Sequence, residues 1–558
     1  MCRGKVATYI RSCFTRTCAA LLLAGAVTLI IAIPATAAGQ SLAGGRTEVF
    51  AGSVLESYLR YLQSLGKSGS EPWSIRGFSP REVDARAPVD SAHPWARRYT
   101  FGRDSAKSID FVRPTAGVIL NTAFPFGGND GPVWAGKGLT GFVQAGISAE
   151  LGPISIRLAP VAFHAANGSY DLYPNSLEGD GRLRHGQFPD LIDLPQRFGE
   201  GAYARLDPGE STIRADGFGL AAGVSTASQW WGPTDVYPYV LGNNAGGFRH
   251  VFVGTSKPAS LRFISFHGRL VYGLLDQSSM SPVTGSAFHE SPEEPGTTRF
   301  MAGVVAVLQL TGVPGFEVGG SRFFHSPRER DGISSDQLAL PFQNLYRRNL
   351  PTIEGRENQL GSLFVRWTPT GTGFDIYGEY GREDFSADTR DYLLQPEHAA
   401  MTNVGFRKAW GSPSSINALR AEVFSYESSA GSRTRDEGLA FLHGVLLQGH
   451  TQRGQLLSAA VGPGSGNAQS VAFDRFTRGG RVTASFSRFT AHENRIAEPG
   501  QIIDPATDVM NSLGAEVTRF VGRLDVTAKM VLTRQLNRHL EDRDATNASF
   551  GLSVRHGF

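Results

Sequence analysis

The feature that most constrains this chain is a two-residue alternation of apolar and polar side chains beyond about residue 110. At positions 523–532 the polar set is Arg523, Asp525, Thr527 and Lys529, and the apolar set is Leu524, Val526, Ala528, Met530 and Leu532. Successive side chains of a β-strand point to opposite faces, so this segment is predicted to be a strand with one aliphatic and one charged face. A soluble β-sandwich would show the same alternation.

Length and composition favour a membrane barrel over a sandwich. The alternating segments run for about 9–11 residues, the length that a tilted membrane strand needs. Many end in an aromatic residue such as Trp134, Trp367 or Tyr380, as the aromatic girdles of a barrel require. Glycine is frequent (67 of 558 residues), and charged residues make up only 19%, against about 25% in soluble chains. Beyond the first forty residues no apolar stretch is long enough for a membrane helix.

The last residues point the same way. Phe550, Leu552 and Val554 alternate, and Phe558 stands in the same phase. This ending resembles the insertion signal of bacterial outer-membrane barrels, so Phe558 is predicted to be a barrel-assembly signal. A closed barrel removes the unpaired strand edges. With about 450 residues at about 25 per strand and connection, roughly 16–20 strands are expected, in an even number.

The first residues predict export. An apolar run at 19–33 is followed by Pro34 and the small-residue pattern Ala35-Thr36-Ala37, and it is preceded by the basic residues Arg3, Lys5, Arg11 and Arg16. This is the pattern of a cleaved signal peptide over 1–37. The run is short for a membrane anchor, which needs about 20 residues. All three cysteines (Cys2, Cys13, Cys18) lie in this leader, which excludes disulfides and thiolate metal sites from the mature chain.

A different period precedes the strands. Leu55, Tyr58, Leu59, Leu62 and Leu65 recur at steps of three and four, which predicts an amphipathic helix. A second short helix is predicted from the capping box of Ser79 and Glu82, and it ends before Pro88. The predicted organisation is therefore a signal peptide over 1–37, a helical segment over 38–105 and a barrel over 106–558. Long polar stretches near 164–200, 276–298, 325–358 and 427–438 are predicted to be extracellular loops.

Several short strings occur in an order that resembles the Wzi capsule-assembly family. They are Gly131–Leu139 (GPVWAGKGL), Gly152-Pro153, Leu158–Val161, Gln229–Pro233 (QWWGP), Leu241–Asn244 (LGNN), Gly254-Thr255, Glu357–Leu360, Arg366-Trp367, Tyr377–Asp384 (YGEYGRED), Pro396–His398, Arg453–Gln455 and Gly462–Gly464. The resemblance covers about 110 to 480. The chain is longer than the best-known members, and the segment near 55–85 indicates a variant subgroup.

This resemblance implies an all-β outer-membrane barrel of about 18 antiparallel strands, with the N-terminal helices plugging its periplasmic side. It also implies a lectin-like protein that holds capsular or other exported polysaccharide at the surface of a Gram-negative-type bacterium. The other expected partners are outer-membrane lipids and the barrel assembly machinery. Without the four basic residues of the leader, 50 basic residues face 51 acidic ones, so no nucleic-acid partner is expected.

The candidate carbohydrate-binding residues are Gln229, Trp230, Trp231, Asn243 and Asn244. Indole rings stack on sugar rings, and amides bind hydroxyl groups. Both groups also have a structural interpretation. The Trp pair would suit a girdle or a packed corner, and adjacent Asn residues commonly form a turn.

A second group is predicted to form a charge network in the lumen. Along 374–384, Phe374, Ile376, Gly378 and Tyr380 share one face, and the acids Asp375, Glu379 and Glu383 share the other. A charge facing hydrocarbon costs several kcal/mol near the bilayer midplane, so the acids are expected to point inwards. Arg366 is expected to pair with Glu379. The predicted network is Arg366, Asp375, Glu379, Arg382, Glu383 and Arg453.

No enzyme is predicted, and no cofactor or metal. Paired carboxylates suggest a glycosidase, but such acids usually crosslink the lumen of a plugged barrel. The chain has no Gly-x-Ser-x-Gly elbow, and its 13 histidines lack metal-site spacing. Polysaccharide binding is therefore the leading hypothesis. A porin-like sugar or solute channel is the first alternative, and a barrel hydrolase such as a phospholipase is the second.

Overall fold

The computed structural model describes residues 47–99, 101, 107–283, 298–328, 332–343, 357–383, 388–429, 431, 435, 437–444, 446–492 and 507–557. The expected leader (1–37) and Phe558 lie outside these residues.

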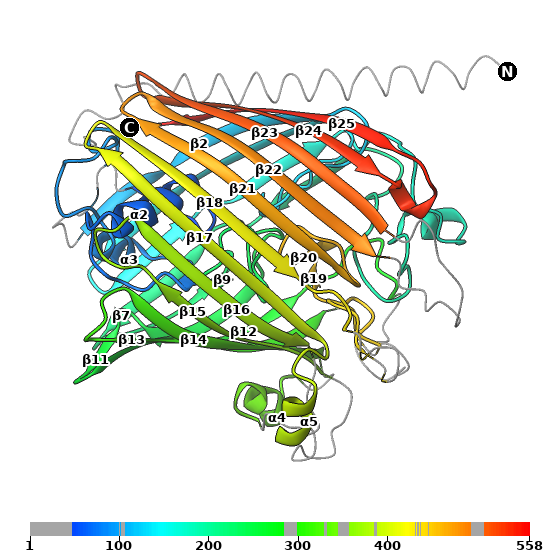
Figure 1. Cartoon of the computed structure of the whole chain (residues 1–558), viewed down its shortest axis with the longest axis horizontal. Coiled ribbons are helices and arrows are strands. Elements are labelled where there is room, and N and C mark those ends of the chain that lie inside the picture. The colour runs from blue at the N-terminus through cyan, green and yellow to red at the C-terminus, as the bar shows by residue number, and fades with distance from the viewer. Residues whose placement is uncertain are drawn as a thin grey trace.

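One closed antiparallel sheet dominates the molecule (Figure 1). Its segments are β2 (Lys107–Asn121), β3 (Gly138–Leu151), β4 (Ile154–Leu158), β5 (Val161–Ala165), β6 (Tyr203–Asp207), β7 (Thr212–Gly217), β8 (Leu220–Ser225), β10 (Arg249–Thr255), β11 (Ala259–Leu261), β12 (Ile264–Leu275), β13 (Arg299–Leu310), β14 (Phe316–Pro327), β15 (Asn358–Trp367), β16 (Phe374–Glu383), β17 (Ala400–Ser412), β18 (Ser415–Ser425), β21 (Gly466–Thr477), β22 (Gly480–His492), β23 (Thr507–Val521), β24 (Leu524–Leu536) and β25 (Ala545–His556).

Within the described residues these segments make 18 strands, which confirms the expected number. Three strands are each interrupted by a proline and its neighbours: β4 and β5 at Pro160, β6 and β7 at Pro208, and β10 and β11 at Pro258. Proline lacks the N–H that a central strand would donate, so it breaks the ladder at these points. The barrel closes where β2 pairs with β25, from Thr115↔Arg555 to Asn121↔Ser549.

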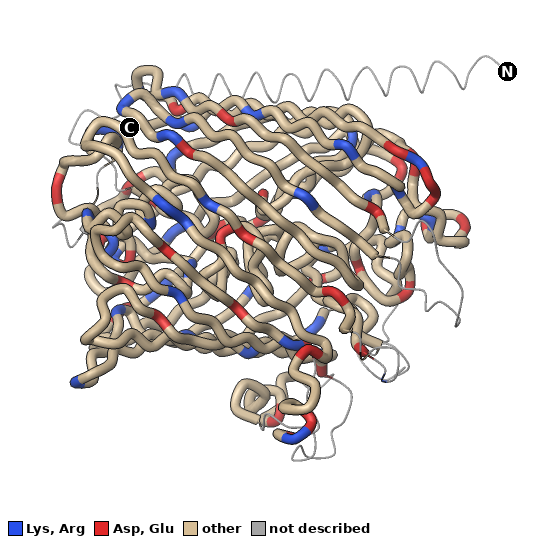
Figure 2. The backbone as a smooth tube through the Cα atoms, in the orientation of Figure 1, with Lys and Arg blue, Asp and Glu red and all other residues tan. Residues whose placement is uncertain are grey.

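The wall has an apolar outer face and a polar inner face. On β24, Leu532 is 47% exposed, whereas Asp525 on the opposite face is 5% exposed. On β4, Ile154 is exposed and Arg157 is buried. Charged residues occur along the strands (Figure 2), and on β24 Asp525 and Lys529 take the inward parity, whereas Arg534 near the long-connection end takes the outward one. An apolar exterior on a closed sheet is the arrangement that hydrocarbon requires, so the protein is a membrane-spanning barrel of the outer-membrane type.

Among the described residues, no helix is both long and apolar enough to cross a membrane.

The two ends of the barrel differ. Short turns join the strands at one end, and two of them place glycine at positive φ (Gly152, 64°; Gly522, 57°). The opposite end carries the long connections, including 166–202, 226–248 and 426–465. These hold η1 (Gly179–Leu183), α4 (Ser335–Ala339), η2 (Leu340–Phe342), α5 (Thr389–Leu394), β19 (Thr451–Gln452), β20 (Gln455–Leu456) and η5 (Arg538–Leu540). In outer-membrane barrels the short turns face the periplasm.

The N-terminal segment contains the two predicted helices, α2 (Val54–Ser64) and α3 (Pro80–Ala85). Ser79 and Glu82 form the expected capping box. Both helices lie towards the short-turn end (Figure 1), where the Gly373 N–H donates to the Ser64 carbonyl at 2.8 Å. The buried face of α2 packs with barrel residues Ile416, Ala418 and Phe476 in one apolar cluster.

The barrel wall has a step between β6 and β8, where the strands stop farther from the long-connection end. The five residues of β6 pair with β5, and among the described residues no strand pairs with the other edge of β6. β8 stops after six residues, and the following chain, 226–248, includes β9 (Trp230–Trp231), which pairs with β1 (Ile75–Arg76). The β19–β20 hairpin bridges the step, because Arg453 binds both Asp207 of β6 and Asp276 after β12, each at 3.0 Å.

Candidate functional site

The lumen has a filled half, where the N-terminal segment is bound to strands β14 to β17. Its centre is Arg366 on β15, which is fully buried between Glu317 and Asp375. Arg366 Nη2 also donates to Gln63 Oε1 of α2 at 2.9 Å. A buried guanidinium needs such partners, because leaving a charge unpaired in a low-dielectric interior is costly. The structure places Arg366 and Asp375 of the predicted network together in this cluster, at 2.8 Å.

Glu317 joins the N-terminal segment to the same cluster. Its carboxylate accepts the backbone N–H groups of Trp73 (3.1 Å) and Ser74 (3.2 Å) and the Ser74 hydroxyl (2.7 Å). From α2, Arg60 approaches Asp375 at 3.7 Å. The wall therefore binds backbone as well as side chains of the segment, which fixes the segment's register against the wall.

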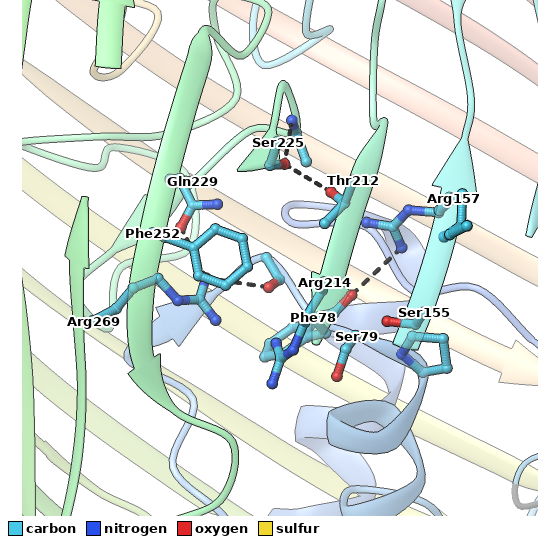
Figure 3. Close-up of a pocket in the computed structure, with 14 residues that line it drawn as sticks. Phe78, Ser79, Ser155, Arg157, Thr212, Arg214, Ser225, Gln229, Phe252 and Arg269 are labelled. Carbon is cyan, nitrogen blue, oxygen red and sulfur yellow. Dashed lines mark hydrogen bonds between the residues drawn. The ribbon is translucent and has the colours of Figure 1, made fainter. Parts of the chain in front are cut away.

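A second cluster holds α3 against β4, β7 and β12. Figure 3 shows Arg157, Arg214 and Arg269 projecting from these strands around Phe78 and Ser79. Arg214 donates to Glu82 Oε2 at 2.7 Å, and Arg157 donates to Glu48 Oε2 at 2.9 Å. The space left between them is only about 30 Å³, which suits about one water molecule. This pocket is too small for a sugar.

Glu82 is the charged centre of that cluster. Burial alone would raise the pKa of its carboxyl group, but the guanidinium groups of Arg214 and Arg269 outweigh burial and lower the pKa to about 2. Its carboxylate also accepts the Ser79 N–H at 2.8 Å, which caps α3. One ionised carboxylate therefore fixes the helix start and binds the wall.

The rest of the predicted charge network does not gather in one place. Glu379 is 5% exposed and does not pair with Arg366; its carboxylate lies beside Gly232, where an added Cβ would come within 2.9 Å. Glu383 accepts Asn358 Nδ2 at 3.1 Å and the Phe441 N–H at 2.7 Å. Arg453 lies at the step in the wall, where it binds Asp207 and Asp276.

The prediction for Arg382 is wrong. It has the strand parity of Gly378 and Tyr380, opposite to Asp375, Glu379 and Glu383, so its side chain is on the outer face. Its guanidinium lies 5.4 Å from the ring centroid of Tyr392 in the long connection after β16. A guanidinium at this rim reaches the polar zone of the membrane, so an outward charge is tolerated there.

The interpretation of the Trp pair as sugar-stacking residues is also wrong. Trp230 and Trp231 are 1% and 0% exposed. The Arg76 guanidinium covers the Trp230 ring at 4.2 Å, and Trp231 belongs to the main apolar cluster of the lumen. The packed-corner interpretation is therefore the correct one, since β9 pairs with β1 inside the barrel.

The three amide residues of the predicted sugar site lie in different parts of the lumen. Gln229 is 4% exposed, and its Oε1 accepts Arg269 Nη1 at 2.8 Å, so it belongs to the α3 cluster. Asn243 and Asn244 are only partly buried, and each lines a cavity in the lumen. The Asn244 Nδ2 donates to the Leu456 carbonyl at 3.0 Å.

These cavities form the open half of the lumen. One, of about 400 Å³, lies between the N-terminal segment and the inner face of β24 and β25. Its polar lining includes Asp130, Gln144, Asn243, Glu516, Thr527, Lys529, Ser549 and Ser553. Hydroxyl, amide and mixed charged groups in a roomy cleft suit a polar, hydroxylated ligand.

The other cavity, of about 280 Å³, lies on the long-loop side of the first. It combines carboxylate and amide groups with an apolar wall: Asp130, Asn244, Gln455, Phe126, Trp134, Phe489 and Met510. Aromatic faces together with a few fixed polar groups are the usual chemistry of carbohydrate recognition.

The connection between β2 and β3 separates the two cavities. Asn121 at the end of β2 clamps it, because Asn121 Nδ2 donates to the carbonyls of Phe126 and Ala135, both at 2.9 Å. Its tip is tied to the predicted Asn pair, because the Gly131 N–H donates to the Asn243 carbonyl at 2.7 Å. Asp130 is exposed and lines both cavities.

Asp130 and Trp134 were missed as site residues by the sequence analysis. Trp134 was interpreted as a girdle residue, but it lies in the lumen with its ring 5.0 Å from that of Phe198 and 6.1 Å from that of Tyr203. The signal was available, because both residues lie in or beside the string 131–139 that contributes to the family resemblance.

Among the described residues, no group of three His, Cys, Asp or Glu side chains is arranged to hold a metal.

No family model matches the chain, and no curated protein matches it. The structure of Wzi from Escherichia coli is similar: an outer-membrane protein involved in group 1 capsule assembly and a carbohydrate-binding β-barrel. The match has 13% identity and a TM-score of 0.58 over 92% of this chain and 100% of that one. At this identity the likeness shows a shared fold, and membership of the family stays a prediction.

Two porin structures also match, at lower similarity. OccK2 (OpdF) of Pseudomonas aeruginosa is 10% identical with a TM-score of 0.34, over 81% of this chain and 97% of that one. A BenF-like porin of Pseudomonas fluorescens is 11% identical with a TM-score of 0.34, over 81% and 99%. These TM-scores are too low to support an inference about this chain.

Proposed function

We propose that this barrel binds an exported polysaccharide at the cell surface, in the open half of its lumen. The observation that carries the proposal is the clamped connection between β2 and β3, which places Asp130 beside both cavities and Trp134 beside the one on the long-loop side. A carboxylate that accepts sugar hydroxyls and an indole that meets a sugar face are complementary to a pyranose.

The neighbouring groups support a glycan over a charged small molecule. The larger cavity is lined by Asp130, Glu210 and Glu516 as well as Lys529, together with serine and threonine hydroxyls and amides. Such a lining offers many hydrogen-bond partners to the hydroxyl groups of a glycan, and its excess of acids disfavours a small anion. The carbohydrate-binding barrel Wzi shares the fold, and we extend its kind of ligand to this chain on that basis.

We further propose that binding involves no bond cleavage and that the N-terminal segment plugs the periplasmic mouth. The segment is fixed to the wall at three places: Arg366 binds α2, Glu317 binds the backbone at Trp73, and Arg214 binds Glu82 of α3. A segment bound at so many points would close most of the lumen to solutes.

Retention of labelled native polysaccharide on cells tests the proposal. Cells with the gene should retain more polysaccharide than cells without it, and complementation should restore retention. Unchanged retention across all native glycans would contradict the proposed function.

Point variants locate the effect. Asp130→Ala should lower affinity by about tenfold or more, because a hydrogen bond to a charged group contributes about 1.5–3 kcal/mol. Asp180→Ala is the matched control, since Asp180 is an exposed acid in η1 that lines neither cavity. Both variants need normal barrel levels in the outer membrane for the comparison to count.

The porin-like channel is the second candidate, and the two cavities favour it. They lie on the two sides of one connection and share Phe126, Gly127, Asp130 and Val133 in their linings. A displacement of this connection would therefore join the two cavities into one continuous space. Purified protein in planar bilayers tests this: conductance at the level of an ion channel would favour the channel over the polysaccharide-binding barrel.

We propose that the two ends of the chain serve export and assembly, through the signal peptide 1–37 and Phe558. Deleting Phe558 should lower the amount of heat-modifiable barrel in the outer membrane. Normal barrel levels would contradict this role.

A further inference from the structure

The step in the barrel wall is accompanied by a groove on its outer face. The groove has a volume of about 590 Å³ and a mostly apolar lining, which is within the range of about 300–1,000 Å³ for ligand sites. Its floor includes the outward-facing residues Ile213, Val224 and Val251, which are 47%, 50% and 49% exposed. Their neighbours Arg214 and Phe252 are buried, so the groove lies on the lipid side.

The local fold explains why the wall is hollowed there. β8 ends at Ser225, level with Thr212 of β7 and His250 of β10, whereas β6 continues alone towards the long-loop end. A missing stretch of strand removes side chains from the outer surface as well as hydrogen bonds from the ladder. The hairpin that bridges the step lies against the wall from the inside, through Arg205 Nη2 and Gln455 Oε1 at 3.1 Å.

The other side of the groove is raised by the connection that holds α4. Leu340 packs with Phe300 and Phe324 in a small apolar cluster on the outer wall, and the Tyr272 hydroxyl donates to the Leu338 carbonyl at 2.8 Å. Ile333, which is 50% exposed, extends from this connection to line the groove. The groove thus has a floor of strands and a wall made by a folded connection.

One cation lies at its edge. The Arg249 side chain is 55% exposed, lines the groove and binds Asp276 at 2.7 Å. Asp276 in turn binds Arg453, so the position of Arg249 is fixed by the ion pairs that bridge the step. An apolar groove that ends at a positioned guanidinium is complementary to a lipid with acyl chains and a phosphate.

We propose that this groove is a binding site for lipopolysaccharide, with an acyl chain of its lipid A in the groove and a lipid A phosphate on Arg249. The groove is continuous with the lipid-facing wall and lies at the starts of β10 and β13, in the half of the barrel that carries the long connections. That half faces the outer leaflet, where lipopolysaccharide is the main lipid. The site is independent of the lumenal cavities and of the proposed polysaccharide ligand.

Native mass spectrometry of the purified protein with added lipopolysaccharide tests the proposal. The wild type should retain one tightly bound lipopolysaccharide. Val251→Trp fills the groove and should lower its affinity by at least about tenfold, which corresponds to about 1.4 kcal/mol. Val482→Trp is the matched control, because Val482 on β22 is 48% exposed and far from the groove in the sheet order. Heat modifiability should show that both variants fold.

Arg249→Gln should weaken binding of lipopolysaccharide but leave binding of its dephosphorylated form unchanged. Equal retention of lipopolysaccharide by Val251→Trp and the wild type would overturn the groove site. So would retention of phosphatidylethanolamine as strongly as lipopolysaccharide by the wild type. If Arg249→Gln weakens binding but Val251→Trp does not, the lipid makes only a surface phosphate contact, and this result too would overturn the proposal.

Discussion

The two halves of the lumen are lined by different kinds of side chain. Strands β14 to β17 present charged residues, among them Glu317, Arg366 and Asp375, and each is paired or bonded to the N-terminal segment. The inner face of β24 and β25 presents smaller hydroxyl residues such as Thr527, Ser549 and Ser553, beside an unfilled cavity.

This difference explains why one part of the lumen is filled by the N-terminal segment and another part is open. Buried charges need partners, and the N-terminal segment supplies them at β14 to β17, at the α3 cluster and, through Arg98, at Asp525 near the short-turn end of β24. Hydroxyl groups can exchange a protein partner for water or a ligand at little cost, so the other side can stay open. The proposed sugar site therefore lies where the wall has few buried charges that need a partner from the N-terminal segment.

Removing the central cation of the filled half should have the largest effect. Arg366→Leu leaves Glu317 and Asp375 buried without it, which should lower the free energy of unfolding by about 3–5 kcal/mol. Lys529→Leu makes a similar change on the open half and should stay within about 0.5 kcal/mol. Urea titrations of both variants, followed by tryptophan fluorescence, check this. Equal losses would contradict the difference between the halves.

Acid should loosen the α3 cluster next. The pKa of Glu82 is lowered to about 2 by Arg214 and Arg269 despite burial, against about 4.3 in the unfolded chain. Its contribution of about 3 kcal/mol is fully present above the unfolded pKa and is lost as the pH falls towards 2. Other groups in this cluster, Arg86 and His267, also face the carboxylate.

Urea titrations between pH 6 and pH 3 measure this loss. The Glu82→Gln variant should lose less stability over this range than the wild type, and Asp180→Asn in the exposed η1 should behave as the wild type does. If the wild type and Glu82→Gln lose stability in parallel, Glu82 does not anchor α3 as described.

The smallest expected difference in stability is between alanine substitutions at two glycines, one in each half of the lumen. A Cβ at Gly381 would lie 2.1 Å from the ring of Tyr239 in the filled half, so Gly381→Ala should cost about 1–3 kcal/mol by overpacking. At Gly551 on β25 the nearest atom is Lys529 Cβ at 3.5 Å, so Gly551→Ala should be nearly neutral. Thermal unfolding of the two variants separates them, and a larger loss for Gly551→Ala would reverse the comparison.

Much of the barrel could be predicted from alternation because strand parity decides which side chains face lipid. Parity placed Asp375, Glu379 and Glu383 inwards correctly. The same parity should have placed Arg382 outwards. The helices α2 and α3 were predicted from local signals, periodicity and a capping box, which do not depend on the rest of the fold.

The site was predicted less well because parity says nothing about segments that leave the wall. The Trp230-Trp231 pair looks like an exposed binding motif, yet pairing with Ile75 and Arg76 buries it. That pairing joins residues more than 150 positions apart, and no local pattern reveals it. The expected pair of Arg366 with Glu379 failed for a related reason, since the approach of Glu317 and Asp375 depends on register between strands.

Oxidative footprinting of the purified barrel, with and without its native exported polysaccharide, tests the central claim most directly. Trp134 and Met510 line the cavity on the long-loop side, whereas Trp230 and Trp231 are buried under the N-terminal segment. Saturating polysaccharide should protect Trp134 and Met510 from oxidation and leave Trp230 and Trp231 unchanged. Unchanged oxidation of Trp134 and Met510 at saturation would contradict a glycan site in the open half of the lumen.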